Sequence, residues 1–380
     1  MTDIKIGLLI GGLGRGGSER QVVELARGLH ALGAHVEVAV YGDCAPPDDY
    51  LNDASVRIRI LHGRSKLSKL TAVRDWIRRF QPDVLHGFMK RASMTAILAV
   101  AGLKSTRVVA SDFSTATYSR HKPILWIALL LFAFADHVVT QTDTNRRSIT
   151  MFAPWLRRKI SVIRNGVDID RFIPRDYPLS DATSFRFIVV GTVYSVKNPI
   201  RIVHAARSLA QKCPTPFRID WYGRYGPKGD THPSEACIQA KALVDRFQLD
   251  SIIRFHGETS HIELKYAESN AILHPSLQEG IPNAVVEAMA SGLPIIVSRV
   301  SDLPLLVETG QNGFICDETD AESIAESMRR MIEMDQEERS QMGERSRKLA
   351  VSWFSGTRFV SDYLNLYQRL MAHTRTDAYE

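Results

Sequence analysis

The stretch that decides the fold is Ile4-Lys5-Ile6-Gly7-Leu8-Leu9-Ile10-Gly11-Gly12-Leu13-Gly14-Arg15-Gly16-Gly17-Ser18-Glu19. Its first seven residues form a compact apolar run, which is typical of a buried strand. A glycine loop follows, and a helical pattern extends from residue 18 to residue 32. A strand, a loop and a helix at the start of the chain predict the first unit of a parallel α/β sheet.

The same alternation continues along the first half of the chain. Further strands are expected at 36–40, 56–61, 84–87, 107–110 and 137–140, and further helices at 70–80, 92–101 and 122–135. A second series begins at residues 185–191 and places strands at 218–222, 252–255, 271–274 and 294–297. Helical stretches lie between these strands, so each half of the chain predicts a doubly wound parallel sheet.

The length of 380 residues agrees with two domains, because single cores rarely grow beyond roughly 250–300 residues. Residues 164–184 carry prolines and aspartates with little periodicity, which predicts the connection between the domains. We expect a Rossmann-like domain at 1–170, a second at 171–352, and a helix at 353–380 that packs back on the first. Ligands bind such sheets at the carboxyl ends of the strands, so the two domains would face a shared cleft.

The composition is that of an ordinary globular protein, with 44% apolar and 24% charged residues. The four cysteines show no CxxC spacing, which predicts neither a disulfide framework nor a zinc site and favours a reducing compartment. No signal peptide precedes the first strand, so we expect a cytoplasmic protein. The longest apolar run, 123–135, is shorter than the roughly 20 residues of a spanning helix. It predicts a buried helix, with a membrane-dipping helix as the alternative.

The net charge of +6 is unevenly distributed along the chain. Residues 1–170 carry 24 Lys and Arg against 15 Asp and Glu, a net charge of +9, and the remainder has a net charge of −3. A basic first half suits peripheral contact with an anionic membrane, or an anionic acceptor. A solvated basic face without any partner is the alternative. No basic stripe with interleaved aromatic residues is present, so no nucleic-acid partner is expected.

The most specific motif is Leu277-Gln278-Glu279-Gly280-Ile281-Pro282-Asn283-Ala284-Val285-Val286-Glu287. Pro282 suits the first position of a helix, which places Glu279 in the preceding loop and Glu287 between one and two turns inside. The backbone N–H groups of Gly280, Ile281 and Asn283 would then offer a phosphate site. Carboxylates accept hydrogen bonds from pairs of hydroxyl groups. A sugar, a diphosphate and a ribose would therefore fit one carboxylate, the phosphate site and the other carboxylate. The alternative is an acidic helix start with a dipole role alone.

Two further groups follow predicted strands. Lys197 lies in the loop after 185–191, where its ammonium group would neutralise a diphosphate leaving group. A solvated surface lysine is the alternative. His86 ends the strand at 84–87 and Arg91 follows closely, so both are candidates for contacting an acceptor. The alternative for His86 is a histidine with satisfied hydrogen bonds in the core.

The glycine loop at residues 11–19 admits three interpretations. Gly12, Gly14 and Gly17 match the GxGxxG fingerprint of dinucleotide binding, for which Asp43 is a candidate acidic partner. The additional glycines make the loop longer and more flexible than that fingerprint needs. In the second interpretation, its backbone amides would approach a phosphate from the side of the cleft opposite the second domain. The third interpretation is a plain tight turn between strand and helix.

Together these segments resemble the family 4 retaining glycosyltransferases, which have the GT-B fold. The resemblance covers almost the whole chain and rests on residues 11–19, 83–86, 165–168, 190–197, 279–294 and 312–315. It implies transfer of a sugar from a nucleotide-sugar donor to a hydroxyl group, with the anomeric configuration retained. A UDP-sugar is the favoured donor, and the acceptor would be a glycan or a lipid-linked acceptor in polysaccharide or glycoconjugate biosynthesis.

The resemblance also implies roles for individual residues. The second domain would hold the donor, with Glu279 on the hydroxyls of the transferred sugar, Glu287 on the ribose, and Gly280, Ile281, Pro282 and Asn283 bringing backbone amides to it. Lys197 would offset the charge of the leaving diphosphate, and Gly16 and Gly17 would close over it. The first domain would hold the acceptor. No metal ion or other cofactor is expected.

The sequence departs from the family pattern at two positions. Thr192 stands where the family often has arginine, so Arg224, Arg299 or another base would have to supply that charge. Phe88 stands where many relatives have a second histidine, so no catalytic histidine is assigned. Beside the glycosyltransferase, two other functions stay open: an NAD-dependent oxidoreductase that uses the glycine loop, and a GT-B binding protein that has lost turnover.

Overall fold

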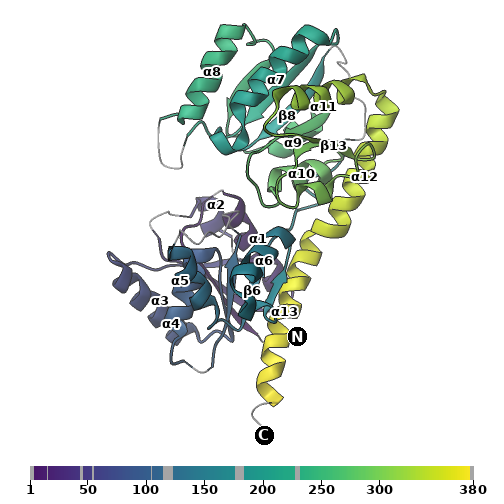
Figure 1. Cartoon of the computed structure of the whole chain (residues 1–380). Helices are drawn as coiled ribbons and strands as arrows, with labels where there is room; N and C mark the ends of the chain where they lie inside the picture. Colours follow the sequence, from purple (N-terminus) through teal and green to yellow (C-terminus); the bar gives the residue numbers. More distant parts are fainter. Residues whose placement is uncertain are drawn as a thin grey trace. The chain divides into compact units, whose positions relative to one another are not determined.

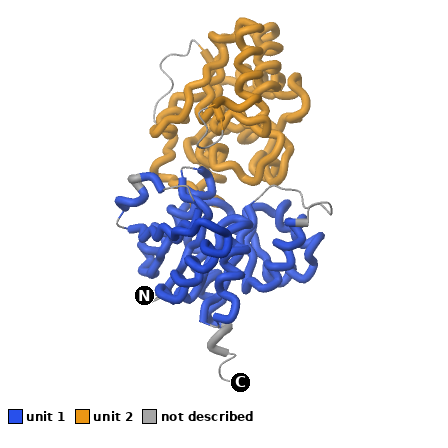
Figure 2. The backbone as a smooth tube through the Cα atoms, turned by 90° about the vertical axis from the view of Figure 1, so that its left-hand side faces the viewer, with its two compact units in different colours: residues 1–166, 356–380 blue, residues 167–355 orange. Residues whose placement is uncertain are grey.

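The chain forms two compact units, which Figure 2 shows in blue and orange. Unit 1 comprises residues 1–166 and 356–380, and unit 2 comprises residues 167–355. The computed structural model describes residues 4–14, 16–42, 46–53, 55–103, 105–113, 123–175, 184–226 and 232–376. The chain therefore passes between the units twice, after Gly166 and after Ser355.

Unit 1 contains a seven-stranded sheet in the order β3-β2-β1-β4-β5-β6-β7, and every pairing is parallel. The direction of winding reverses between β1 and β4, which creates a topological switch point at the carboxyl ends of these two strands. The strands are β1 (Lys5–Ile10), β2 (His35–Val40), β3 (Arg57–Ile60), β4 (Val84–Gly87), β5 (Arg107–Asp112), β6 (His137–Thr140) and β7 (Ile160–Val162).

Helices cover both faces of this sheet (Figure 1). One face packs against α1 and α13, and the other against α3, α4, α5 and α6. Both faces are therefore covered, and most of the strands are largely apolar, as expected for a parallel sheet, whereas the edge strand β3 is mostly exposed. The helices are α1 (Gly17–Ala31), α2 (Asp48–Leu51), α3 (Lys66–Phe80), α4 (Lys90–Val100), α5 (Pro123–Phe132), α6 (Asp143–Phe152), the 3-10 turn η1 (Pro154–Leu156) and α13 (Gly356–Thr376).

Unit 2 repeats this architecture with a six-stranded parallel sheet in the order β10-β9-β8-β11-β12-β13. Its switch point lies between β8 and β11. The strands are β8 (Phe185–Val190), β9 (Phe217–Tyr222), β10 (Ile253–Gly257), β11 (Ala271–His274), β12 (Ile295–Ser298) and β13 (Gly313–Cys316). The helices are α7 (Pro199–Lys212), α8 (Glu235–Phe247), α9 (Ile262–Ala267), α10 (Asn283–Ala290), α11 (Ala321–Glu333) and α12 (Gln336–Phe354), with 3-10 turns η2 (Ser195–Lys197) and η3 (Leu303–Leu306).

The predicted fold class, two doubly wound α/β domains, is confirmed by these two sheets. The strands predicted at 84–87, 137–140 and 271–274 have the observed bounds, and most others differ by a residue or two. The pattern did not predict α6 and β7, because their polar residues interrupt the apolar periodicity.

The helix predicted as buried from the apolar run at 123–135 is only half buried, so that prediction was wrong. Leu125, Leu129 and Phe132 of α5 lie in the core of unit 1. The opposite side of α5 is exposed, although it is also apolar. Among the described residues, no helix is both long and apolar enough to cross a bilayer.

Helix α13 is held in unit 1 by close packing and by buried hydrogen bonds to the sheet. A side chain on Gly28 of α1 would place its Cβ 2.2 Å from Val360 of α13, so the absence of a side chain allows the two helices to approach. The hydroxyl of Tyr367 lies 2.6 Å from Nδ1 of His86 on β4. Helix α13 is therefore tied both to α1 and to the central sheet of its unit.

Stability should fall in acid through His86. Burial, with a smaller effect from the charge of His137, lowers the pKa of His86 from 6.5 to about 3. Between these two pH values His86 is protonated in the unfolded chain but neutral in the folded protein. The contribution of His86 to the free energy of unfolding is therefore complete above pH 6.5 and is lost as the pH falls towards 3. We expect the pH dependence of the free energy of unfolding to be weaker in His86→Phe than in the wild type.

Urea unfolding at a series of pH values across that window measures the difference. His137, whose pKa burial and the nearby Arg369 and Lys159 lower to about 4, contributes in the same window and remains in the variant. An unchanged slope in His86→Phe would contradict the assignment.

Candidate active site

The candidate site in unit 2 lies at the switch point of its sheet. The loop after β8 runs from Gly191 to Lys197, and the loop after β11 runs from Pro275 to Pro282. Because β8 and β11 are neighbours, their carboxyl ends bring the two loops together. The N–H of Leu277 donates to the carbonyl of Val196 at 2.8 Å, which fixes one loop against the other.

Three side chains meet between these loops. The ammonium group of Lys197 and Nε2 of His274 both contact the same carboxylate oxygen, Oε1 of Glu279, the histidine at 3.1 Å. The side chains of Lys197 and Glu279 are 19% and 13% exposed, and that of His274 is 1% exposed. The ion pair is therefore largely shielded from water, although neither Lys197 nor Glu279 is completely buried.

The electrostatics of this cluster keep Glu279 ionised. Burial alone would raise the pKa of Glu279, but the hydrogen bond from His274 and the charge of Lys197 outweigh it and lower the pKa to about 2. Burial and the charge of Lys197 lower the pKa of His274, so its ring is neutral. A neutral ring that hydrogen bonds to a carboxylate through Nε2 must carry its proton there, so His274 is the donor.

The local sequence explains how Lys197 reaches Glu279. Asn198 adopts the left-handed conformation (φ 62°) and ends the turn η2 directly after Lys197. Its amide group donates to the carbonyls of Pro275 at 2.9 Å and Glu318 at 2.8 Å, which ties the lysine-bearing loop to the loop after β11. Gly191 leaves room for the lysine stem, since a Cβ there would lie 3.0 Å from Cε of Lys197. Sequence reasoning missed Asn198, which directly follows Lys197, and His274, which ends β11 five residues before Glu279.

Glu279 precedes helix α10 and Glu287 lies inside it. The helix begins at Asn283, so the prediction that Pro282 is the first helical residue was wrong by one position. Pro282 has an extended ψ of 131° and instead forms the N-cap, where its carbonyl accepts the N–H of Val285 at 3.1 Å. Glu287 follows one turn later and is 3% exposed, and the hydroxyl of Tyr266 lies 3.1 Å from its Oε2.

The turn between the two glutamates is partly anchored in the core. Ile281 is 4% exposed and packs in the apolar core beneath α10, whereas Gly280 is half-buried. Of the predicted donor-binding residues, the fold of unit 2 brings Lys197 against Glu279, and the others, Gly280, Ile281, Pro282, Asn283 and Glu287, follow Glu279 in the turn and in α10.

The remaining predicted residues belong to unit 1. Gly16 is the N-cap of α1 and Gly17 is its first residue. A Cβ on Gly16 would lie 2.3 Å from a carboxylate oxygen of Glu19, so the loop and the first turn of the helix are closely packed. Asp43, the candidate acidic partner of the glycine fingerprint, lies outside the described residues.

Of the two predicted acceptor contacts, only Arg91 is exposed. His86 is fully buried, and besides Tyr367 its ring contacts the hydroxyl of Ser111 at 2.5 Å. The ring of Phe88 packs against it in a tilted arrangement, with the ring centroids 4.3 Å apart. The interpretation as a core histidine therefore describes His86, because both ring nitrogens already have partners within the unit.

No group of three or more His, Cys, Asp and Glu side chains in the described part of the chain is arranged to hold a metal ion.

Thr192, at the position where arginine was expected, has a basic neighbour in the adjoining loop. The N–H of Val193 donates to the carbonyl of Arg224 at 2.8 Å, so the loop after β9 runs beside Thr192.

Comparison with known families decides the class of this chain. The family model described as "Glycosyl transferases group 1" matches residues 174–349, and the model described as "Glycosyltransferase Family 4" matches residues 15–171. The chain belongs to the family 4 glycosyltransferases. This membership sets aside the NAD-dependent oxidoreductase that the glycine loop had left open.

Individual relatives agree with this family. The putative colanic acid biosynthesis glycosyltransferase WcaL of Escherichia coli is 30% identical over 200 residues, which cover 50% of this chain and 47% of WcaL. UDP-Gal:alpha-D-GlcNAc-diphosphoundecaprenol alpha-1,3-galactosyltransferase of Escherichia coli is 28% identical over 221 residues, which cover 55% of this chain and 54% of that protein. The chain thus spans about half the length of these two curated relatives.

A solved structure establishes the fold class. HepE of Anabaena, crystallised in complex with UDP, superposes with a TM-score of 0.83 over 96% of this chain and 100% of HepE, at 18% identity. The family 4 glycosyltransferase described here accordingly has the GT-B fold, as the sequence resemblance predicted.

The role of Gly191 in placing Lys197 can be tested with a matched pair of substitutions. Gly191 and Gly310 both have positive φ values, 146° and 80°, so alanine at either position introduces backbone strain of order 1–3 kcal/mol. Only the alanine at Gly191 also meets the lysine stem, since nothing lies within 4 Å of a Cβ on Gly310. We expect Gly191→Ala, but not Gly310→Ala, to displace Lys197 from Glu279.

Acetylation with acetic anhydride, quantified by mass spectrometry, measures the exposure of Lys197. Labelling of Lys197 should increase in Gly191→Ala and stay at the wild-type level in Gly310→Ala. Equal labelling in both variants would show that Gly191 does not position the lysine.

Proposed function

We propose that this protein is a retaining glycosyltransferase that moves a sugar from a nucleotide-sugar, with a UDP-sugar as the favoured donor, to a hydroxyl of a glycan or lipid-linked acceptor. The contact of Lys197 and His274 with Glu279 at the switch point of unit 2 carries this proposal. The names of the relatives support the substrate class. One is a colanic acid biosynthesis glycosyltransferase, and another has UDP-Gal as donor and a diphosphoundecaprenol-linked acceptor.

The donor would bind around the start of α10. Gly280, Ile281, Pro282 and Asn283 precede or begin this helix, whose N-terminal N–H groups favour the negative charge of a diphosphate. Glu279 before the helix would accept hydrogen bonds from hydroxyls of the transferred sugar, and the buried Glu287 inside it would accept them from the ribose.

Lys197 would change partners when the donor binds. Without donor its ammonium group is neutralised by Glu279. A diphosphate carries more negative charge than one carboxylate, so it would attract the lysine and leave Glu279 free to accept sugar hydroxyls. His274 would keep Glu279 in place during this exchange, because its hydrogen bond does not depend on the lysine.

In the reaction, the bond between the anomeric carbon and the diphosphate oxygen breaks, and a bond from that carbon to the acceptor oxygen forms on the same face of the sugar. The proton of the acceptor hydroxyl passes to the departing nucleoside diphosphate. Lys197 and the N-terminal dipole of α10 would stabilise the charge that develops on the diphosphate. We therefore propose that transfer proceeds without a metal ion and persists in EDTA.

Unit 1 would supply the remaining contacts. Gly16 and Gly17 would approach the diphosphate with backbone amides, and Arg91 would contact the acceptor. His86 would act indirectly, by holding β4 and α13 together. Arg224, whose loop adjoins Thr192, is the candidate for the positive charge that the family often places at that position.

Substitutions should separate the roles of the three charged residues. Lys197→Met should lower kcat by a factor of about 10² to 10³, because a charge aimed at the transition state is lost. Glu287→Gln should mainly weaken donor binding, and Glu279→Gln should impair both binding and turnover. Glu326→Gln, which changes an exposed carboxylate on α11, is the matched control and should leave both unchanged.

Calorimetry with UDP-, GDP-, ADP- and CMP-sugars, with NAD as a negative control, measures binding, and NMR of the product gives the anomeric configuration. Binding of one nucleotide-sugar without any transfer would instead support the binding protein that has lost turnover. An inverted product would refute the retaining mechanism, and binding of NAD alone would overturn the proposal.

A further inference from the structure

Helix α5 is apolar on every side but is enclosed on only one. Its sequence, Pro123–Phe132, contains no polar or charged residue. Such helices are normally surrounded by protein or by lipid. In unit 1, Leu125, Leu129 and Phe132 are at most 7% exposed, whereas Ile124, Ile127 and Leu130 on the other face are 58%, 49% and 56% exposed. The spacing of three residues places these last side chains along one stripe.

The exposed apolar surface extends beyond α5. Helices α4, α5 and α6 share one core cluster on the same face of the sheet, so their outward sides point away from that face together. The rings of Trp126 and Phe152 meet edge to face at 6.0 Å and join α5 to α6. We define the apolar patch as the large exposed side chains of α5, α6 and the turns that follow them: Ile124, Ile127, Leu130, Phe134, Met151 and Trp155.

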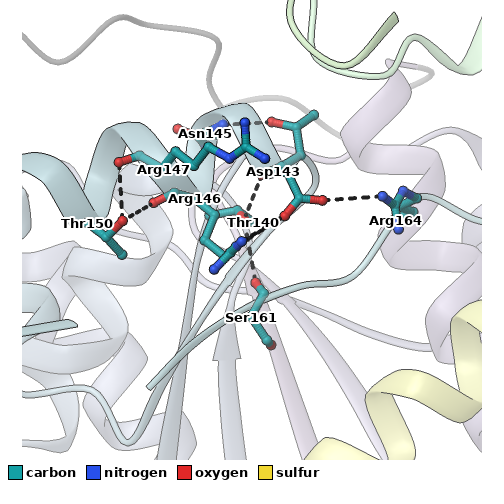
Figure 3. Close-up of polar contacts among 9 residues, drawn as sticks. Thr140, Asp143, Asn145, Arg146, Arg147, Thr150, Ser161 and Arg164 are labelled. Atoms are coloured by element: carbon teal, nitrogen blue, oxygen red, sulfur yellow. Dashed lines mark hydrogen bonds and ion pairs between the residues drawn. The ribbon is translucent and has the colours of Figure 1, made fainter. Parts of the chain in front are cut away.

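The segment that carries this patch is strongly basic. Residues 90–164 contain 12 Lys and Arg and three Asp and Glu, a net charge of +9, which equals the whole excess of residues 1–170. Each of the three carboxylates already has a basic partner. The pairs are Lys90 with Asp112 at 3.3 Å, Arg107 with Asp136 at 2.8 Å, and Asp143 with Arg146 at 3.0 Å and Arg164 at 3.4 Å, the last two shown in Figure 3.

Several of the basic residues adjoin the apolar patch. The ammonium group of Lys159 donates to the carbonyl of Ala135, just beyond the end of α5, at 2.7 Å. Arg157 and Arg158, which precede it and follow Trp155, are exposed. Arg147 is exposed on α6, where Figure 3 shows it beside the pairs of Asp143. We define the basic rim as Arg147, Arg157, Arg158 and Lys159.

We propose that the apolar patch and the basic rim form a binding surface for a bilayer that contains anionic lipids, with α5 lying in the plane of the interface. Apolar side chains and the indole of Trp155 enter the boundary between headgroups and acyl chains, where aromatic residues are favoured. Arginine and lysine side chains lie along apolar surface while their charged ends contact lipid phosphates.

Charge favours a membrane over a second copy of this chain as the occupant. Two copies joined through this face would bring two segments of net charge +9 together, and like charges across an interface are unfavourable. An anionic leaflet neutralises the same charges. The inference goes beyond the sugar transfer proposed above and rests on unit 1 alone, so it stands whichever donor the protein uses.

Sedimentation of the full chain with vesicles tests the proposal. We expect binding to vesicles of phosphatidylcholine mixed with phosphatidylglycerol, much weaker binding to phosphatidylcholine alone, and a loss of affinity as salt is added. The double variant Ile127→Asp/Leu130→Asp should bind at least tenfold more weakly. The matched control, Ile238→Asp/Leu264→Asp, changes side chains of similar exposure, 56% and 55%, in unit 2 and should bind like the wild type.

A second variant keeps the proposal testable if the first does not fold. Arg157→Gln/Arg158→Gln alters only exposed side chains and should reduce binding to the anionic vesicles by about tenfold or more, since each base near the surface contributes about fivefold. Transfer to a water-soluble acceptor should be unchanged, which separates loss of membrane binding from loss of activity. Absence of binding to either vesicle would overturn the proposal. An equal loss of vesicle binding in Ile238→Asp/Leu264→Asp would also overturn it. The same holds if light scattering detects a dimer that Ile127→Asp/Leu130→Asp abolishes.

Discussion

Parallel pairing of strands is the constraint on which the rest of this structure depends. Every strand of a parallel sheet ends at the same edge, so the loops that follow the strands gather there, far from the loops that precede them. The order of each sheet reverses once, between β1 and β4 in unit 1 and between β8 and β11 in unit 2. Two loops diverge at each reversal, which leaves room for side chains and a ligand.

In unit 2 this constraint brings together residues that are 82 positions apart in the sequence. Lys197 and Glu279 each follow one of the two diverging strands, and burial strengthens their attraction because less water screens it. A buried carboxylate is costly unless it has partners, and here His274 and Lys197 provide them. The cluster is thus a prearranged set of charges, and in the proposed function its lysine would become available when a more strongly charged ligand competes with Glu279.

Unit 1 has the same architecture but a different distribution of apolar and basic side chains on its surface. Its core is complete beneath α5, yet α5 presents a second apolar face, and nine net positive charges are concentrated between Lys90 and Arg164. Neither feature is required to stabilise the sheet, because the buried face of α5 already packs in the core. Both features are accounted for by the membrane-binding surface proposed above.

The sequence could predict those elements whose side chains repeat with a clear period. The strand at 84–87 and the strand at 271–274 are short apolar runs, so their bounds followed from composition. Helix α6, with Asp143, Asn145, Arg146 and Arg147 near its start, lacks such a run and was not predicted. The first position of α10 was misplaced by one residue because proline favours the first helical position, whereas the extended ψ of Pro282 makes it the N-cap.

By itself the sequence determined the fold class, the family, and the motif in which Glu279 and Glu287 flank the start of α10. These features depend on local patterns and on the spacing of residues along one segment. Only the tertiary structure decided that Lys197 and His274 share one oxygen of Glu279, that His86 is enclosed by Tyr367 and Ser111, and that half of α5 faces outward. The hydrogen-bond partners and the burial of a side chain depend on elements that are distant in the chain. The sequence alone therefore does not show whether an apolar residue is covered by protein or exposed.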